Sequence, residues 1–70
     1  MAQVKVYYDK LGNTLTVWFD DPKKEYISEE TGDEIILMKD QAGRVIGFEK
    51  LNFTMADTEP LQVAFEAMAV

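Results

Sequence analysis

Carboxylates are the side chains of this sequence that could do chemistry, because its 70 residues include neither histidine nor cysteine. The absence of histidine removes the commonest general base and the commonest transition-metal ligand. Five carboxylates could bind a hard cation: Asp9, Asp20, Asp21, Asp40 and Glu49. Such a cation needs several oxygens that converge from one loop, and the sequence has no D-x-D-x-D-G spacing. We therefore predict no metal site and no cofactor, and we expect Asp9 and Asp40 to shape turns.

Glu49 is the strongest candidate for an acid or base, because its neighbours in residues 44–51 are largely apolar. A carboxylate in a partly dry pocket can act as a general acid. The simpler interpretation is a cross-strand ion pair with a lysine, or a position at a sheet edge. No nucleophile lies near Glu49 in the sequence, so we expect no catalytic residue. An enzyme that uses Glu49 is the third of three functional hypotheses, and we predict that the protein is not an enzyme.

Aromatic residues offer a second kind of site. Tyr7, Trp18, Tyr26 and Phe48 could form a face of the kind that stacks nucleic-acid bases. However, thirteen acidic and seven basic residues give a net charge of −6, which argues against nucleic acid and against an anionic membrane surface. The charge is compatible with docking onto a basic protein partner. The second functional hypothesis is therefore a small-molecule or metal-binding module whose ligand face contains Tyr7, Trp18 and Glu49.

Four segments that must position these residues have the pattern of strands. Residues 3–9 and 14–20 alternate between apolar and polar side chains, and Gly12 with Asn13 favours a hairpin turn between them. Residues 34–38 and 44–51 are rich in Ile and Val and flank a second turn. We expect Leu15, Val17 and Phe19 to be core, and residues 28–32 to be a loop. Two consecutive hairpins predict a four-stranded antiparallel β-meander over residues 3–53.

The tail predicts one C-terminal helix over residues 57–69, which makes the expected fold class α+β. Asp57 or Thr58 could cap the helix, and Pro60 suits its first turn. Apolar residues then recur with helical spacing, and a second apolar edge lies beside that stripe. The stripe contains Leu61, Ala64, Phe65 and Met68, and the edge contains Val63, Ala67 and Val70.

Apolar residues on both sides of the second hairpin indicate a cover from outside the sheet. A domain of this size without disulfides has a marginal core, and association is the remaining way to stabilise it. We therefore expect a homo-oligomer, specifically a dimer. The leading hypothesis is a non-enzymatic interaction module that self-associates and docks a protein partner. The candidate interface consists of Ile36, Met38, Phe48, Leu61, Val63, Phe65, Ala67 and Met68.

Location and domain count follow from the same sequence. Residues 1–6 lack the basic and apolar regions of a signal peptide, and no uncharged apolar run approaches the ~18 residues of a membrane helix. We expect a single cytoplasmic domain over residues 1–70, with no membrane association. The absence of cysteine fits this location.

Several of these residues resemble a known family. Tyr8 and Asp9, then residues 15–17, LTV, follow the order of its first hairpin, and residues 40–49, DQAGRVIGFE, look like its acidic turn and Gly-aliphatic-Glu motif. The chain resembles, over residues 4–51, the family catalogued as domain of unknown function 2283. Asn13 stands where the family usually has Asp, and Lys50 where it has an aliphatic residue. The resemblance implies a fold and no reaction; members look similar to small antitoxin-like or accessory proteins of bacteria.

Overall fold

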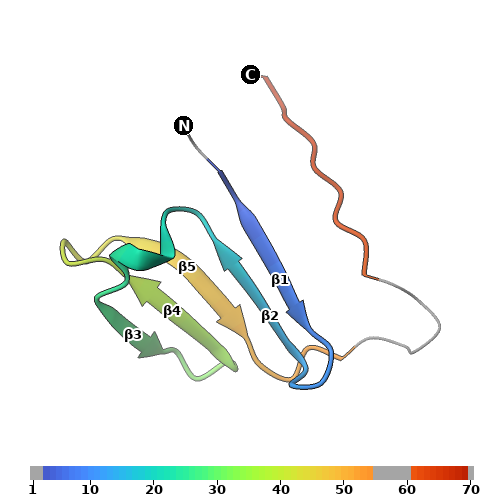
Figure 1. Ribbon diagram of the computed structural model, residues 1–70, viewed down its shortest axis with the longest axis horizontal. Coiled ribbons are helices and arrows are strands. Elements are labelled where there is room, and N and C mark those ends of the chain that lie inside the picture. The colour runs from blue at the N-terminus through green and yellow to red at the C-terminus, as the bar shows by residue number, and fades with distance from the viewer. Residues whose placement is uncertain (1–2, 55–60, 70) are drawn as a thin grey trace.

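The computed structural model, which describes residues 3–54 and 61–69, contains one antiparallel sheet of five strands (Figure 1). The strand order across the sheet is β1-β2-β5-β4-β3. A short 3-10 helix, η1, lies in the connection between β2 and β3. The elements are β1 Lys5–Asp9, β2 Thr14–Trp18, η1 Pro22–Lys24, β3 Ile27–Glu30, β4 Ile35–Lys39 and β5 Val45–Lys50.

The predicted four-stranded meander is wrong in strand number and in order. After β2 the chain crosses the end of the sheet, forms β3 at the far edge, and returns through β4 to the middle, where β5 pairs with β2. This order is a Greek key read against the chain direction. The Phe19 amide donates to the Ile46 carbonyl (2.7 Å) and the Tyr26 amide to the Lys39 carbonyl (2.8 Å). These two bonds fix both ends of residues 19–26, which we call the crossing connection.

The strand β3 was not among the four predicted strands, and three of its four residues lie in the segment 28–32 that we expected to form a loop. Ser28, Glu29 and Glu30 have low strand propensity and are exposed. Pairing of their backbone with β4 overrides that propensity, because an edge strand needs a partner on only one side. Lys39 on β4 adds an ion pair to Glu29 (2.6 Å).

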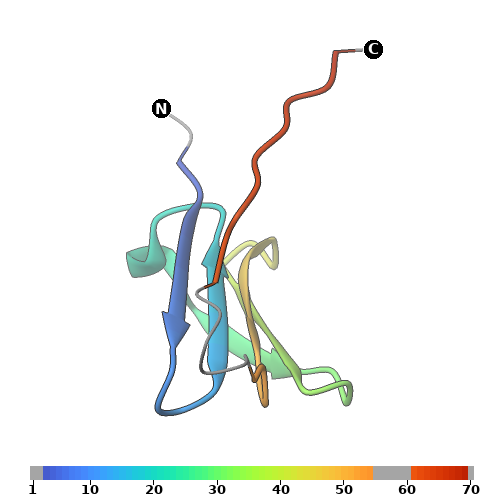
Figure 2. The same cartoon turned by 90° about the vertical axis from the view of Figure 1, so that its right-hand side faces the viewer.

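The predicted C-terminal helix is also wrong. Residues 61–69 contain no helix, and they run away from the sheet as an extended segment (Figures 1 and 2). The first part of the predicted helix, residues 57–60, lies outside the described residues. Val63, Phe65 and Met68 are exposed, so their side chains gain nothing from helical spacing. An isolated helix shorter than about 12–15 residues is marginal in water. A helix over residues 61–69 would therefore need to pack on the sheet, and these exposed side chains do not do so.

The sheet forms a single layer with two different faces. Directly paired residues of antiparallel strands share a face, so the register assigns each side chain to one side. The Trp18 face comprises Lys5, Tyr7, Thr16, Trp18, Ser28, Glu30, Ile36, Met38, Gly47 and Glu49. The Phe48 face comprises Val6, Tyr8, Leu15, Val17, Ile27, Glu29, Ile35, Leu37, Lys39, Ile46, Phe48 and Lys50.

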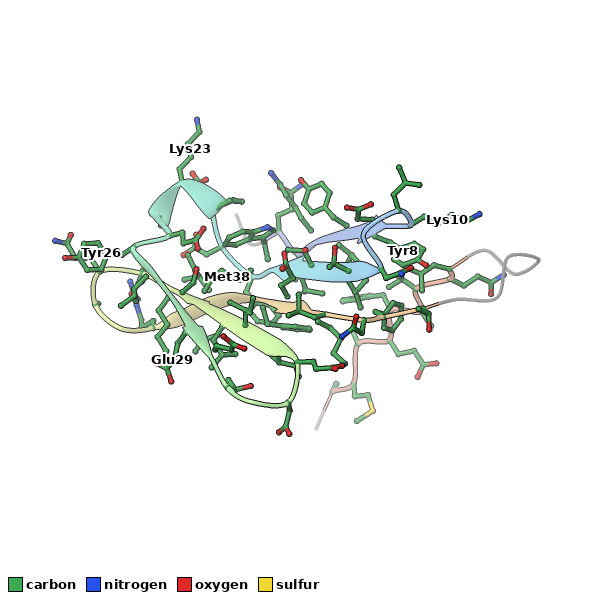
Figure 3. The ribbon with its side chains drawn as sticks, turned by 90° about the horizontal axis from the view of Figure 1, so that it is seen from below. Tyr8, Lys10, Lys23, Tyr26, Glu29 and Met38 are labelled. Atoms are coloured by element: carbon green, nitrogen blue, oxygen red, sulfur yellow. The ribbon has the colours of Figure 1, made fainter. Side chains whose placement is uncertain are left out.

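Little of either face is buried. Within the described residues, only Met38 (5% exposed) and Ile46 (4% exposed) are buried apolar side chains, and they lie on opposite faces. Figure 3 shows side chains projecting from both sides of the ribbon, with Met38 near its middle. Leu15 and Val17, which we expected to be core, are only half-buried and are not among the buried residues. Phe19 packs against Phe48 (ring centroids 6.0 Å apart) but is 47% exposed, so its prediction as a core residue is wrong for this chain alone.

Both turns expected to use an aspartate do so. Asp9 accepts the amides of Leu11 and Gly12, each at 3.0 Å. Asp40 is buried and accepts the amides of Ala42 (3.0 Å) and Arg44 (2.9 Å) and the Arg44 Nε (3.0 Å). The Arg44 amide, with further help from the Arg44 guanidinium, lowers the pKa of Asp40 although burial opposes the shift.

Gly47 is required where β2, β5 and β4 meet. A Cβ at this position would lie 2.7 Å from the Val17 carbonyl oxygen and 2.8 Å from the Trp18 Cε3. Because the nearer atom belongs to the backbone, it cannot move away cheaply. We expect Gly47→Ala to lower the free energy of unfolding by about 1–3 kcal/mol, the usual cost of overpacking.

Urea unfolding at one fixed protein concentration measures this change. Glu30→Ala is the matched control, because Glu30 lies on the same face of the sheet but on its exposed edge strand, β3. The control should stay within about 0.5 kcal/mol of the parent. Equal midpoints for Gly47→Ala and the parent would contradict the close approach.

Asp40 should give the fold a dependence on acid. Its pKa is lowered in the folded state, so the stability that it contributes is present above the unfolded value of about 3.9 and is lost as pH falls through the folded value. We expect Asp40→Asn to melt at a lower temperature than the parent at pH 7, and the gap to narrow below about pH 4. Thermal melts followed by circular dichroism measure this gap.

The exposed Asp33 supplies the control, as Asp33→Asn. This variant should melt with the parent at pH 7. A gap between Asp40→Asn and the parent that stays constant from pH 7 to pH 3 would mean that the Asp40 charge does not stabilise the turn.

Candidate functional site

A pocket of about 220 Å³ opens on the Trp18 face. Four strands and the loop before β3 contribute to it, so the crossing connection and the central place of β5 both help to build it. Its lining residues are Thr16, Trp18, Glu25, Ser28, Ile36, Met38 and Glu49.

Two of the three residues of the predicted ligand face lie in this pocket. Trp18 and Glu49 line it, whereas Tyr7 lies beyond Thr16 on β1 and does not. The register places Tyr7 and Glu49 on either side of Thr16, and Trp18 points to the same side as Thr16. Tyr7, Trp18 and Glu49 therefore share a face, as predicted. Their role in binding a ligand stays a prediction.

The apolar wall depends on Gly47. A Cβ there would meet both the Trp18 ring (2.8 Å) and the Met38 Cε (3.2 Å), so the missing side chain lets these two residues approach each other across β5. Met38 is the buried apolar side chain of this wall, and Trp18 and Ile36 are half-buried. The wall is therefore a fixed part of the fold.

Two carboxylates form the polar side of the pocket. The Thr16 hydroxyl donates to the Glu49 Oε2 (3.3 Å), and the Ser28 hydroxyl donates to the Glu25 Oε2 (2.5 Å). Each hydroxyl orients one carboxylate and engages only one of its two oxygens. The cross-strand partner of Glu49 is thus a threonine, and the lysine ion pairs of the described residues involve other acids.

The sequence missed Thr16, Glu25 and Ser28 as parts of this site. Strand alternation had already placed Thr16 on the face of Trp18, so that signal was available. Glu25 and Ser28 reach the pocket only because the chain crosses to the far edge of the sheet, which no local pattern indicates.

A second hollow, of about 440 Å³, lies at the end of the sheet. Two of its cations are in ion pairs: Lys24 pairs with Asp20 (3.2 Å) and Arg44 with Asp40 (3.0 Å). The Asp21 amide and Lys24 lower the pKa of Asp20. Tyr26 lines this hollow and is therefore separate from Trp18. The hollow is lined by Lys23, Lys24, Glu25, Tyr26, Asp40, Gln41, Ala42 and Arg44.

The five carboxylates considered for a cation do not converge. Asp9 and Asp40 lie in turns at different ends of the strands, and Glu49 lies within β5. In residues 3–54 and 61–69, no group of three or more acidic side chains could hold a metal ion.

The candidate interface residues do not form one surface. Ile36 and Met38 lie on the Trp18 face, whereas Phe48 lies on the other. Val63, Phe65 and Met68 of the tail are exposed, and they are not part of the sheet. A contact through one face of the sheet can therefore include only some of these residues. The sequence pattern did not indicate which face that would be.

Comparisons with known proteins bear on the sheet as a whole. A family described as a protein of unknown function (DUF2283) matches residues 5–53, which contain all five strands and the whole connection between β2 and β3. No curated protein and no solved structure matches the chain. Within the described residues, no helix is both long enough and apolar enough to cross a membrane. Since the match covers well over half of the sequence, the chain belongs to the DUF2283 family of proteins of unknown function.

Proposed function

We propose that the protein is a non-enzymatic module that self-associates by packing its Phe48 face against the same face of a second copy. The observation that carries this proposal is the incomplete burial of the more apolar face of a single-layer sheet. On that face Val6 is 38% exposed and Ile27 55% exposed, and the adjoining Phe19 is 47% exposed. A second copy would cover these side chains and complete the core.

The small size of the domain supports the proposal. Apolar burial is the main favourable term in folding, and here only two apolar side chains of the described residues are buried. The chain has no cysteine that could supply a disulfide. Association is the remaining way to remove the Phe48 face from water.

Charge favours this face over the opposite one. The lysines of the Phe48 face are paired, Lys39 with Glu29 (2.6 Å) and Lys50 with Glu34 (3.3 Å), so the surface around the apolar residues is nearly neutral. The Trp18 face carries Glu30 and Glu49, with Glu25 beside them, and Lys5 opposite Trp18 offsets only part of this negative charge. Two copies that met through the Trp18 face would bring like charges together.

The proposed contact has twofold symmetry, because a twofold contact uses the same patch on both subunits. Sheet faces that pack on each other lie about 10 Å apart with interdigitating side chains. The β3 edge is a poorer route, because β3 is only four residues long and carries two glutamates, which oppose edge-to-edge pairing.

Adjacent residues of β1 provide a matched pair of variants. Val6 points to the Phe48 face and Tyr7 to the Trp18 face, and both are substantially exposed. We expect the parent to have the mass of a dimer by light scattering, Val6→Lys to shift toward monomer at the same concentration, and Tyr7→Lys to remain dimeric. The lysine at position 6 would be placed in a dry interface without a partner, which is costly.

Circular dichroism controls for folding, because both variants should keep the strand signal of the parent. The melting temperature of the parent should also rise with protein concentration, as for any folded state that is stabilised by association. A monomer mass from micromolar to millimolar concentration would refute the proposal. Dissociation by Tyr7→Lys but not by Val6→Lys would refute the choice of face.

A further inference from the structure

We propose that the pocket on the Trp18 face binds an organic cation, specifically an alkylammonium or guanidinium group on a short aliphatic stem. This site is distinct from the proposed self-association, because it lies on the opposite face of the sheet. A twofold dimer through the Phe48 face would leave one such pocket open on each copy.

The charge of the lining selects a cation. Glu25 and Glu49 are the ionisable residues that line the pocket, and both are acidic. Thr16 and Ser28 each engage one carboxylate oxygen, the Oε2, which leaves the Oε1 of each glutamate to accept from a ligand. The net charge of −6 attracts a cation from longer range.

The apolar wall selects an organic cation over a metal ion. Trp18, Ile36 and Met38 can cover an aliphatic stem, and an indole is the best aromatic partner for a cation above its ring. A hard metal ion would instead require about six to eight oxygen ligands. Figure 3 shows Met38, which belongs to this wall, near the middle of the sheet rather than at its edge.

The volume limits the size of the ligand. The pocket has a volume of about 220 Å³ and is open to solvent. This space accommodates a four-carbon stem with its charged head, which is the size of a lysine or arginine side chain. Two sources share this chemistry: a free small amine, and a basic side chain presented by a protein partner.

Fluorescence of the full-length protein tests the site directly, because Trp18 is the only tryptophan. Titration with butylammonium or butylguanidinium should change the emission saturably. Butanol, which has the stem without the charge, and butyrate, which has the opposite charge, should give no saturable change at the same concentrations and ionic strength. An equal response to butanol would overturn the proposal, as would no response to either cation.

Charge-removing variants locate the binding. Glu49→Gln and Glu25→Gln should each weaken butylammonium binding about fivefold, the effect expected for one partly exposed ion pair. Glu30→Gln is the matched control, because Glu30 shares the face but does not line the pocket. Equal weakening by Glu30→Gln would show a general effect of charge and overturn the assignment to this pocket.

Two further measurements distinguish a free amine from a basic protein side chain, and the cation pocket from the proposed self-association. A blocked Gly-Lys-Gly peptide that binds at least as tightly as butylammonium would identify a lysine side chain as the ligand, whereas binding of the free amine alone would identify a small molecule. Either result supports the pocket. Val6→Lys should bind butylammonium as the parent does, so that loss of the dimer leaves this site measurable.

Discussion

The pairing of β5 with both β2 and β4 is the interaction on which the rest of this structure depends. It turns two separate units, the β1–β2 hairpin and the β3–β4–β5 unit, into one sheet. Gly47 lies on β5 between β2 and β4, where a larger residue would collide with the Val17 carbonyl oxygen and the Trp18 ring. The same close approach that joins the two units also builds the wall of the pocket.

Local sequence patterns predicted the parts of the fold that local physics determines. Alternation located β1 and β2, and branched residues located β4 and β5. Asp9 and Asp40 were correctly expected in turns, because a carboxylate that accepts nearby amides stabilises a reversal wherever the strands go. The family resemblance, which rests on these same strings, is confirmed by the match over residues 5–53.

The errors arose where contacts distant in sequence decide the outcome. The order of strands depends on pairing between segments that are distant in sequence. Ile46 and Gly47 are both buried on β5, but their residue types do not indicate which strands lie beside them. Backbone pairing recruits β3 against its composition. Helical spacing in the tail predicted which side chains a helix would place on one face. It could not predict whether the sheet offers a surface on which that face would pack. For the pocket, Trp18 and Glu49 were predictable, whereas Glu25 depends on the crossing connection.

The two faces divide the chemistry of this small domain. One is apolar with its lysines paired, and it suits a copy of itself; the other holds a pocket lined by an indole and two glutamates, and that pocket suits a cation. In the proposed dimer, a second copy covers the Phe48 face. An isotope-filtered nuclear Overhauser experiment on a mixture of labelled and unlabelled chains tests it most directly. We expect intermolecular contacts among Val6, Phe19 and Phe48, and contacts confined to the Trp18 face or the tail would contradict this packing.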